Sequence, residues 1–372
     1  MGIYIKPRLL WIFIISLLAT MTPSMCSNMS AWTNLTSSMD DKRLPDSVLI
    51  CTFVSCSLSI MGSIVVFVTY CTIPEAKNQT RRLLVYLTIA DLLTSSGNLL
   101  GAIRYSYTHR NHELITEQHI LWHCHHPDDV CAIQSLINTF STLASFSWTI
   151  IIGLHILLAL VYQSEWCFTT MPKVLAHSVS WGIPLVITLT AAFKNVLGED
   201  LYIVSGPWCW IRGCLDRENI ILWMTVGGKG WEILTYIVTA FLYIYLKYYM
   251  IRKRRREGQP NLRYSQISYR LRDDDENYVL LWFVLYILRI WGTARYVKFV
   301  YEASTGQTSE LDFDQTDMVL MHFQSVGDSS QAFFNCLLFC VKDSTVRHGL
   351  LTRLFCRRNQ LQGRQLNEYN QI

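Results

Sequence analysis

Long apolar runs of the sequence contain ionisable side chains, among them Asp91, Lys229, Glu232, Arg289 and Asp328. A charged side chain at bilayer depth costs at least about 3 kcal/mol, so each of them indicates a pairing or functional site. Lys229 and Glu232 are three residues apart and can pair on one helix. Glu232 and Arg289 come at similar depths in their runs, which predicts an interhelical ion pair. That pair would be either a switch that breaks when a helix swings outward or a permanent structural contact.

The two aspartates predict a second polar site. At about 1.5 Å per helical residue, Asp91 lies roughly 14 Å from the end of its run at Arg82. Asp328 lies about 12 residues from the outer end of its own run. This places Asp328 near the same depth in the membrane as Asp91. With Ser145 and Ser329 as neighbours, the two acids would share a cation or a proton. The alternative is a hydrated polar patch in which the charge of one acid keeps the other protonated.

The apolar runs that carry these groups are long enough to cross a membrane. Hydrophobic residues make up 51% of the 372 residues and charged residues 16%, against about 25% charged residues in soluble domains. About 20 apolar residues span a bilayer as a helix, which satisfies every backbone group in lipid. The sequence therefore predicts an all-α membrane protein, a seven-transmembrane helix bundle over 48–341, with helices at about 48–72, 83–104, 131–162, 174–193, 219–248, 278–301 and 316–341.

The segments outside the bundle predict its orientation. Residues 1–26 have the short apolar core of a cleaved secretory signal, with an uncleaved anchor as the alternative. Lys and Arg number 19 in the segments assigned to the cytoplasm and 6 in those assigned to the outside. The tail 27–47 is therefore expected outside the plasma membrane and the tail 342–372 inside. Glycosylation sequons at Asn28 and Asn34 agree with this topology.

Four cysteines face the oxidising side in this topology and allow three disulfide connectivities. Cys131 opens the third helix and Cys209 lies midway through the second outer loop. A Cys131–Cys209 bridge would therefore hold that loop over the mouth of the bundle. Cys124 and Cys214 would then be left as a second bridge or as free thiols.

The outer mouth is rich in aromatic and titratable side chains. Trp208 and Trp210 are expected to form the lid of a ligand pocket, or else part of an interfacial belt. Arg104 either extends to the membrane surface or faces the ligand cavity. Six histidines in the first outer loop predict a solvated loop, with a zinc site or a proton sensor as alternatives. The six are His109, His112, His119, His123, His125 and His126.

The inner face has a basic run, formed by Arg252, Lys253, Arg254, Arg255 and Arg256. Such a run is expected to stop membrane transfer and to contact anionic lipid. Cys356 follows an amphipathic stretch rich in Arg and Leu, which is expected to form a helix in the cytoplasmic tail. Palmitoylation of Cys356 would hold this stretch on the inner leaflet, and the alternative is a free thiol.

Six stretches within about 48–340 carry a family resemblance. They are RLLVYLTIADLL at 82–93, STLASFSW at 141–148, SWGIP at 180–184, WCWI at 208–211, GKGWEI at 228–233 and QAFFNC at 331–336. These stretches resemble G-protein-coupled receptors, in the branch that links slime-mould cyclic-AMP receptors with secretin and adhesion receptors. The resemblance implies an extracellular ligand, and a heterotrimeric G protein that docks against the basic run. It also implies a bridge from helix three to the second outer loop, and a sodium ion near Asp91 as in many rhodopsin-like receptors.

The sequence departs from better-known receptor patterns at three places. Helix three ends in HILLALVY at 155–162 without Asp-Arg-Tyr, helix seven has no Asn-Pro-x-x-Tyr, and the outer tail is too short for a hormone-binding domain. The rhodopsin-like activation switch and a peptide-hormone binding mode are therefore not expected. A transporter or channel is the main alternative, although the odd number of helices and the lack of an inverted repeat argue against it. The hydrolase and protease motifs expected of an enzyme are also missing from the sequence.

Overall fold

The described chain is almost entirely helical. This computed structural model describes residues 44–74, 77, 79–110, 128–158, 170–200, 205–256, 262–305, 315–342 and 346–347. The first three helices are α4 (Asp46–Thr72), α5 (Gln79–Arg110) and α7 (Asp129–Leu157). The next rod consists of α8 (Thr170–His177), the π-helical turn η4 (Ser178–Gly182) and α9 (Ile183–Phe193).

Three further rods follow along the chain. The first consists of α10 (Arg217–Met224), the π-helical turn η5 (Thr225–Lys229) and α11 (Gly230–Arg256). The second is α12 (Leu262–Thr305), and the third is α13 (Gln315–Cys336) with its π-helical extension η6 (Leu337–Lys342). Each predicted span overlaps one rod. The third span was expected to reach 162, but 159–162 lie outside the described residues.

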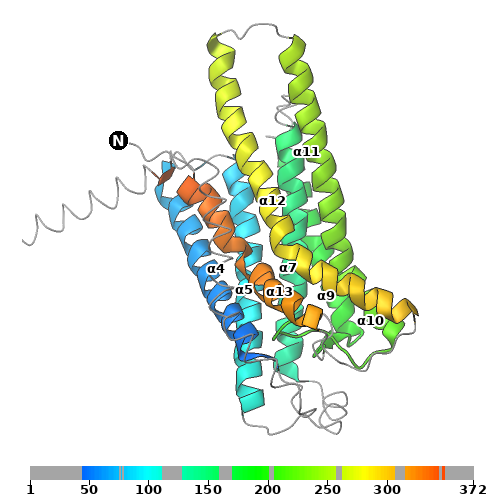
Figure 1. Cartoon of the computed structure of the whole chain (residues 1–372). Coiled ribbons are helices and arrows are strands. Elements are labelled where there is room, and N and C mark those ends of the chain that lie inside the picture. The colour runs from blue at the N-terminus through cyan, green and yellow to red at the C-terminus, as the bar shows by residue number, and fades with distance from the viewer. Residues whose placement is uncertain are drawn as a thin grey trace, which may run out of the picture.

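The rods close into a bundle around α7. Helix α4 packs against α5 and α13, α5 packs against α7, and α12 packs against α11 and α13. Helix α7 also contacts α9, α11 and a small antiparallel hairpin of β1 (Leu197–Gly198) and β2 (Trp210–Ile211). We call the end of the bundle with this hairpin the hairpin end. The opposite end, where α11 and α12 project at the top of Figure 1, is the far end.

Helices α11 and α12 extend further than the sequence predicted. A loop was expected over 249–277, but α11 continues through the basic run to Arg256 and α12 begins at Leu262. Arg, Lys, Glu and Leu are good helix formers, so a charged segment with this composition continues a helix into solvent. The basic run is therefore presented on a helix that projects beyond the other rods (Figure 1).

Several helices have the length and surface of membrane spans. In the described part of the chain, four are long and apolar enough to cross a membrane: Asp46–Thr72, Gln79–Thr108, Asp129–Leu157 and Pro172–Phe193. Their outward faces carry exposed aliphatic side chains, such as Ile64 (53% exposed) and Val186 (65% exposed). Apolar surface of this kind is suited to contact with lipid.

A large apolar cluster lies toward the far end, whereas the half of the bundle nearer the hairpin end combines smaller apolar clusters with many buried polar side chains. Trp148 is fully buried in the apolar part. Its ring centre lies 5.0 Å from that of Tyr86, 5.1 Å from that of His177 and 5.8 Å from that of Trp181, which joins α5, α7 and the α8–α9 rod. The buried side chains of α7 nearer the hairpin end include Gln134, Asn138, Ser141 and Ser145. A functional site is therefore expected in the polar half.

Candidate functional site

A polar cavity of about 50 Å³ lies inside the hairpin end of the bundle. Helices α5, α7, α11, α12 and α13 contribute to its wall, together with η5 and the segment around β2. The lining residues are Thr94, Asn98, Asn138, Thr142, Ser205, Trp208, Trp210, Gly227, Gly228, Lys229, Glu232, Arg289, Gln324 and Asp328. Charged groups in the interior of a bundle indicate a functional site, and four of these residues are ionisable.

Lys229 reaches the cavity from the π-helical turn η5, a feature that is frequent at functional sites. Its Nζ donates to Glu232 Oε2 at 2.9 Å, and the two residues are only 5% and 2% exposed. Glu232 Oε1 accepts hydrogen bonds from Tyr236 Oη at 2.9 Å and from Thr293 Oγ1 on α12. The pair predicted between Lys229 and Glu232 is present, and it is buried with further donors around the carboxylate.

Arg289 does not form the ion pair that was expected with Glu232. Its Nε donates to Gln331 Oε1 on α13 at 3.1 Å, and its guanidinium carbon lies 5.0 Å from the centre of the Phe146 ring. The expectation was wrong because Arg289 is directed toward α13, where Gln331 accepts from its Nε, and not toward α11. The contact that joins α11 to α12 at this level is the hydrogen bond between Thr293 and Glu232.

A chain of hydrogen bonds leads from Arg289 to Asp91. Gln331, which accepts from Arg289, donates from Nε2 to Ser145 Oγ at 3.3 Å. Ser145 Oγ donates to Asp91 Oδ1 at 2.6 Å, and Asn335 Nδ2 donates to Asp91 Oδ2 at 2.9 Å. Polar contacts therefore connect α12 through α13 and α7 to α5.

Asp91 and Asp328 lie at different depths, which corrects the expectation of a common level. Asp91 contacts Asn335, and Asp328 is seven residues, about 10 Å, nearer the hairpin end on the same helix. Asp328 Oδ2 accepts from Gln324 Nε2 at 3.1 Å and the side chain lines the cavity. The estimate failed because α5 and α13 do not begin and end at the same level. A cation or proton shared by the two acids does not fit this spacing.

A sodium ion at Asp91 alone stays a prediction. The oxygen ligands on offer are the Asp91 carboxylate, Ser145 Oγ and Asn335 Oδ1. Asn335 Oδ1 accepts no hydrogen bond from the described residues, so it is available as a ligand. Oxygen donors of this kind suit a hard cation.

Residues 205–209, which lead into β2, form a lid over the cavity. Cys131 at the start of α7 is bonded to Cys209, with 5.6 Å between the Cα atoms. The backbone N–H of Cys209 donates to Gln134 Oε1 at 2.7 Å. Trp208 and Trp210 lie on either side of Cys209 and both line the cavity. The bridge predicted between helix three and the second outer loop is therefore present, and it holds both tryptophans at the cavity.

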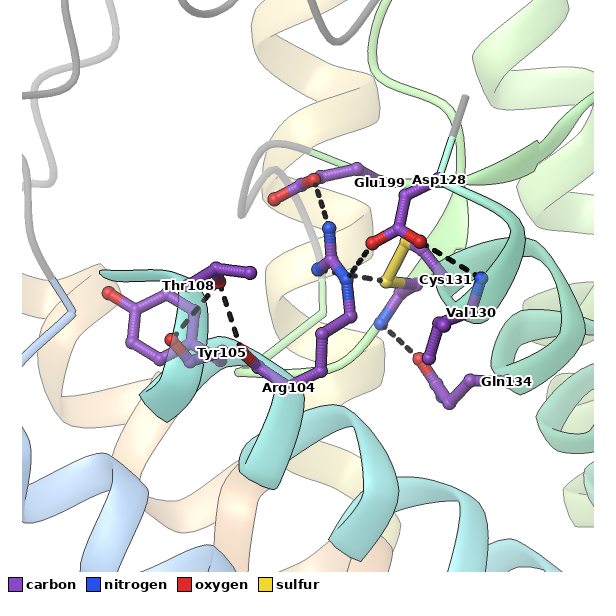
Figure 2. A network of polar contacts seen from close by, with 9 residues as sticks. Arg104, Tyr105, Thr108, Asp128, Val130, Cys131, Gln134 and Glu199 are labelled. Atoms are coloured by element: carbon purple, nitrogen blue, oxygen red, sulfur yellow. Dashed lines mark hydrogen bonds and ion pairs between the residues drawn. A yellow bond between two sulfur atoms is a disulfide. The ribbon is translucent and has the colours of Figure 1, made fainter. Parts of the chain in front are cut away.

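Arg104 anchors this lid (Figure 2) and does not line the cavity, so neither of its two predicted roles is seen. Its Nε donates to Asp128 Oδ2 at 2.5 Å, its Nη2 to Glu199 Oε2 at 2.9 Å and its Nη1 to Cys209 Sγ at 3.5 Å. Asp128 Oδ1 in turn accepts from the N–H of Val130 at 2.9 Å and caps α7. One guanidinium group thus joins α5, the start of α7 and the lid.

Replacing Arg104 with glutamine is expected to lower the melting temperature of the purified protein at neutral pH. Burial acts to raise the pKa of Asp128, but the hydrogen bond and charge of Arg104 outweigh it and hold the pKa below its usual value of 3.8. A carboxyl group with a lowered folded pKa stabilises the fold above its unfolded pKa, and this contribution disappears as the pH falls through the folded pKa. The loss should be about 1 kcal/mol, because Asp128 is partly solvated.

The control for this prediction is the same comparison in acid. The difference in melting temperature between wild type and Arg104→Gln should shrink as the pH falls well below 3.8. A difference of the same size at both pH values would contradict a role for the Arg104–Asp128 ion pair.

Arg295 on α12 is a second anchor of the lid and was not among the predicted site residues. Its Nη1 donates to the Ser205 carbonyl at 3.1 Å and to Gln324 Oε1 at 2.8 Å, and its Nε lies 3.9 Å from Asp317 Oδ1. Asp200 Oδ2 accepts from the N–H of Ser205 at 2.8 Å. Arg295 also lies in an apolar run, so the criterion that identified Arg289 would have identified it.

The remaining predicted site residues lie away from the cavity or outside the described residues. The basic run closes α11, about 35 Å along the helix from Lys229. Cys214 is disulfide-bonded, but its predicted partner is not among the described residues. Outside the described residues lie Asn28, Asn34, Cys124, Cys356 and the histidines from 112 to 126. In the part of the chain that is described, no group of three His, Cys, Asp or Glu is placed to hold a metal ion.

Known proteins match the sequence of this chain. A family model described as 7 transmembrane receptor (Secretin family) matches residues 46–325. The chain belongs to this receptor family. The receptor is similar to G-protein coupled receptor 157 of Homo sapiens, with 31% identity over 304 residues, which are 81% of each chain. The protein of the same name in Mus musculus is 31% identical over 310 residues, 81% of this chain and 82% of that one.

The receptor is also similar to G-protein coupled receptor 1 of Arabidopsis thaliana, with 25% identity over 180 residues, which are 48% of this chain and 46% of that one. The matched range 46–325 takes in every residue of the cavity wall except Asp328. The family resemblance drawn from the sequence is therefore confirmed.

Proposed function

We propose that this receptor transmits an extracellular signal across the plasma membrane to a heterotrimeric G protein. The match to the receptor family over 46–325 carries the proposal. The relatives named as G-protein coupled receptors support it. Seven rods cross the membrane in this proposal, with the N-terminus outside and the C-terminus in the cytoplasm. The excess of Lys and Arg at the far end supports this orientation.

The hairpin end is the extracellular face in this proposal. A disulfide at this end agrees with an oxidising compartment. The ligand would bind in the polar cavity beneath Trp208 and Trp210, and glycosylation of Asn28 and Asn34 would place sugars on the outer tail. Arg104 and Arg295 would hold the lid in place while the cavity is empty or occupied.

The signal would pass to the far end through α12. At the level of the cavity, α12 is held to α11 by the hydrogen bond from Thr293 to Glu232 and to α13 by the one from Arg289 to Gln331. A ligand can shift α12 only if it binds one arrangement of these contacts better than the other. An outward swing of α12 would break both contacts and open the far end. The hydrogen bonds that run from Gln331 through Ser145 to Asp91 would then lose their link to α12.

The far end would receive the G protein and contact membrane lipids. The basic run from Arg252 to Arg256 lies on the projecting end of α11. There it can dock an acidic or helical segment of the Gα subunit and bind anionic lipid. Palmitoylation of Cys356 would add a second membrane anchor beyond α13.

Guanine-nucleotide exchange tests the proposal directly. Membranes that carry the full chain should accelerate exchange on at least one member of a panel of purified Gα subunits. A variant with glutamine at all five positions of the basic run should reduce that exchange at least about tenfold, at equal receptor amounts, because each charge at the interface attracts its partner. No exchange on any Gα subunit, together with ion or solute flux through the chain, would instead favour a channel or transporter.

A further inference from the structure

The cavity holds two cationic and two anionic side chains, but only one pair of them is joined. Lys229 and Glu232 are hydrogen-bonded to each other, and Glu232 has two further donors. Arg289 and Asp328 are the other two ionisable residues of the wall. Neither of them forms an ion pair with any residue that the structure describes.

Arg289 and Asp328 each present an unused polar atom in this site. Arg289 is 3% exposed, and its Nη2 has no hydrogen-bond acceptor among the described residues. Asp328 Oδ1 is buried and likewise has no donor in the described part of the chain. Their other contacts hold them in place, since Arg289 Nε binds Gln331 and Asp328 Oδ2 binds Gln324. A buried polar atom without a hydrogen-bond partner is costly, so a ligand that satisfies both atoms would be favoured.

The two residues lie close together on neighbouring helices. Helices α12 and α13 approach most tightly where a Cβ built at Gly327 would overlap the carbonyl oxygen of Leu288. Arg289 and Asp328 are the next residues on each helix. One small molecule can therefore reach both of them.

The size of the cavity limits the ligand. A volume of about 50 Å³ is far below the roughly 300 Å³ of a site for a drug-sized molecule. It has room for only a few heavy atoms of a ligand. The rest of the wall supplies amide and hydroxyl groups, from Asn98, Asn138, Thr94 and Thr142.

We propose that this cavity binds a small zwitterion, a molecule with one carboxylate and one ammonium group a few bonds apart. The carboxylate accepts from Arg289 Nη2, and the ammonium group donates to Asp328 Oδ1. This zwitterion is the ligand class for the receptor function proposed above. Only the consequence of binding, a signal to the G protein, rests on that function. A monoanion would leave Asp328 without a partner, and a monocation would leave Arg289 without one.

Binding of simple probes to the purified full chain tests this proposal without any variant. Glycine and β-alanine are the zwitterions, and acetate and methylamine are the fragments of glycine that keep one charge each. A zwitterion should raise the melting temperature in a concentration-dependent way, because a ligand that binds only the folded state stabilises it. Acetate and methylamine at equal concentration should bind at least about tenfold more weakly. If neither glycine nor β-alanine binds, or if a single-charge fragment binds as well, the proposal is wrong.

Variants then assign each charge to its residue. Asp328→Asn should weaken zwitterion binding about 10- to 100-fold and abolish the preference of the site for glycine over acetate. Arg289→Gln should abolish the preference for glycine over methylamine. Asp46→Asn, an identical change at an exposed residue of α4 outside the cavity wall, should leave both preferences unchanged. Preferences are ratios within one preparation, so they do not depend on how much of a variant folds.

The binding assay separates this inference from the proposed function. Zwitterion binding without nucleotide exchange on any Gα subunit would support the site and contradict G-protein coupling. Nucleotide exchange by a receptor that binds neither zwitterion would support the coupling and overturn the inference.

Discussion

Replacing Glu232 with glutamine is expected to lower the free energy of unfolding by about 3–5 kcal/mol. Glu232 is 2% exposed, and Lys229 Nζ lies 2.9 Å from its carboxylate. The variant removes the carboxylate that is hydrogen-bonded to the buried ammonium group of Lys229. Glutamine has nearly the volume of glutamate, so a packing defect does not contribute. Thermal or denaturant unfolding of the purified receptor measures the loss.

The control removes both charges at once. Lys229→Met combined with Glu232→Leu replaces the ion pair by apolar side chains of similar size, and should recover most of the stability that Glu232→Gln loses. Recovery would show that the unpaired charge causes the loss. A double variant no more stable than Glu232→Gln would contradict this explanation.

The sequence identified the buried charges but only some of their partners. Lys229 and Glu232 pair as predicted, because a spacing of three residues places two side chains on one face of a single helix. The partner of Arg289 depends on how α12 is rotated toward α13, and on which other donors bind Glu232. The position of a residue along its apolar run specifies neither the rotation of the helix nor the donors that surround the residue. The ion pair was therefore assigned to the wrong residue.

The spans and the lid show the same contrast between features that the local sequence determines and features that depend on how distant segments meet. Apolar length is a local property of the sequence, so all seven rods overlap predicted spans. The continuation of α11 to Arg256 is set by helix propensity outside the membrane, where hydropathy gives no signal. Arg104 was expected at the surface or in the cavity, but its partners Asp128 and Glu199 come from two other segments. Their meeting point depends on the path of the lid, which the spacing of residues does not specify.

The contact between α12 and α13 depends on Gly327. A Cβ built at this position would overlap the Leu288 carbonyl oxygen, which is a backbone atom and cannot rotate away. Small residues allow helices in a membrane to approach until their backbones touch. Arg289 and Asp328, the next residues on each helix, both line the cavity. Gly327 thus supports both the packing of the bundle and the geometry of the site.

Changing Gly327 to valine is expected to destabilise the receptor by about 3 kcal/mol, because the side chain forces two backbones apart. The change should also weaken any ligand that bridges Arg289 and Asp328, since it increases the distance between them. Gly182→Val is the matched control, because a Cβ at Gly182 meets no atom within 4 Å. Melting temperatures of the two variants against wild type measure the effect. Equal melting temperatures would mean that α12 and α13 can separate at no cost, and that their close approach does not hold the site together.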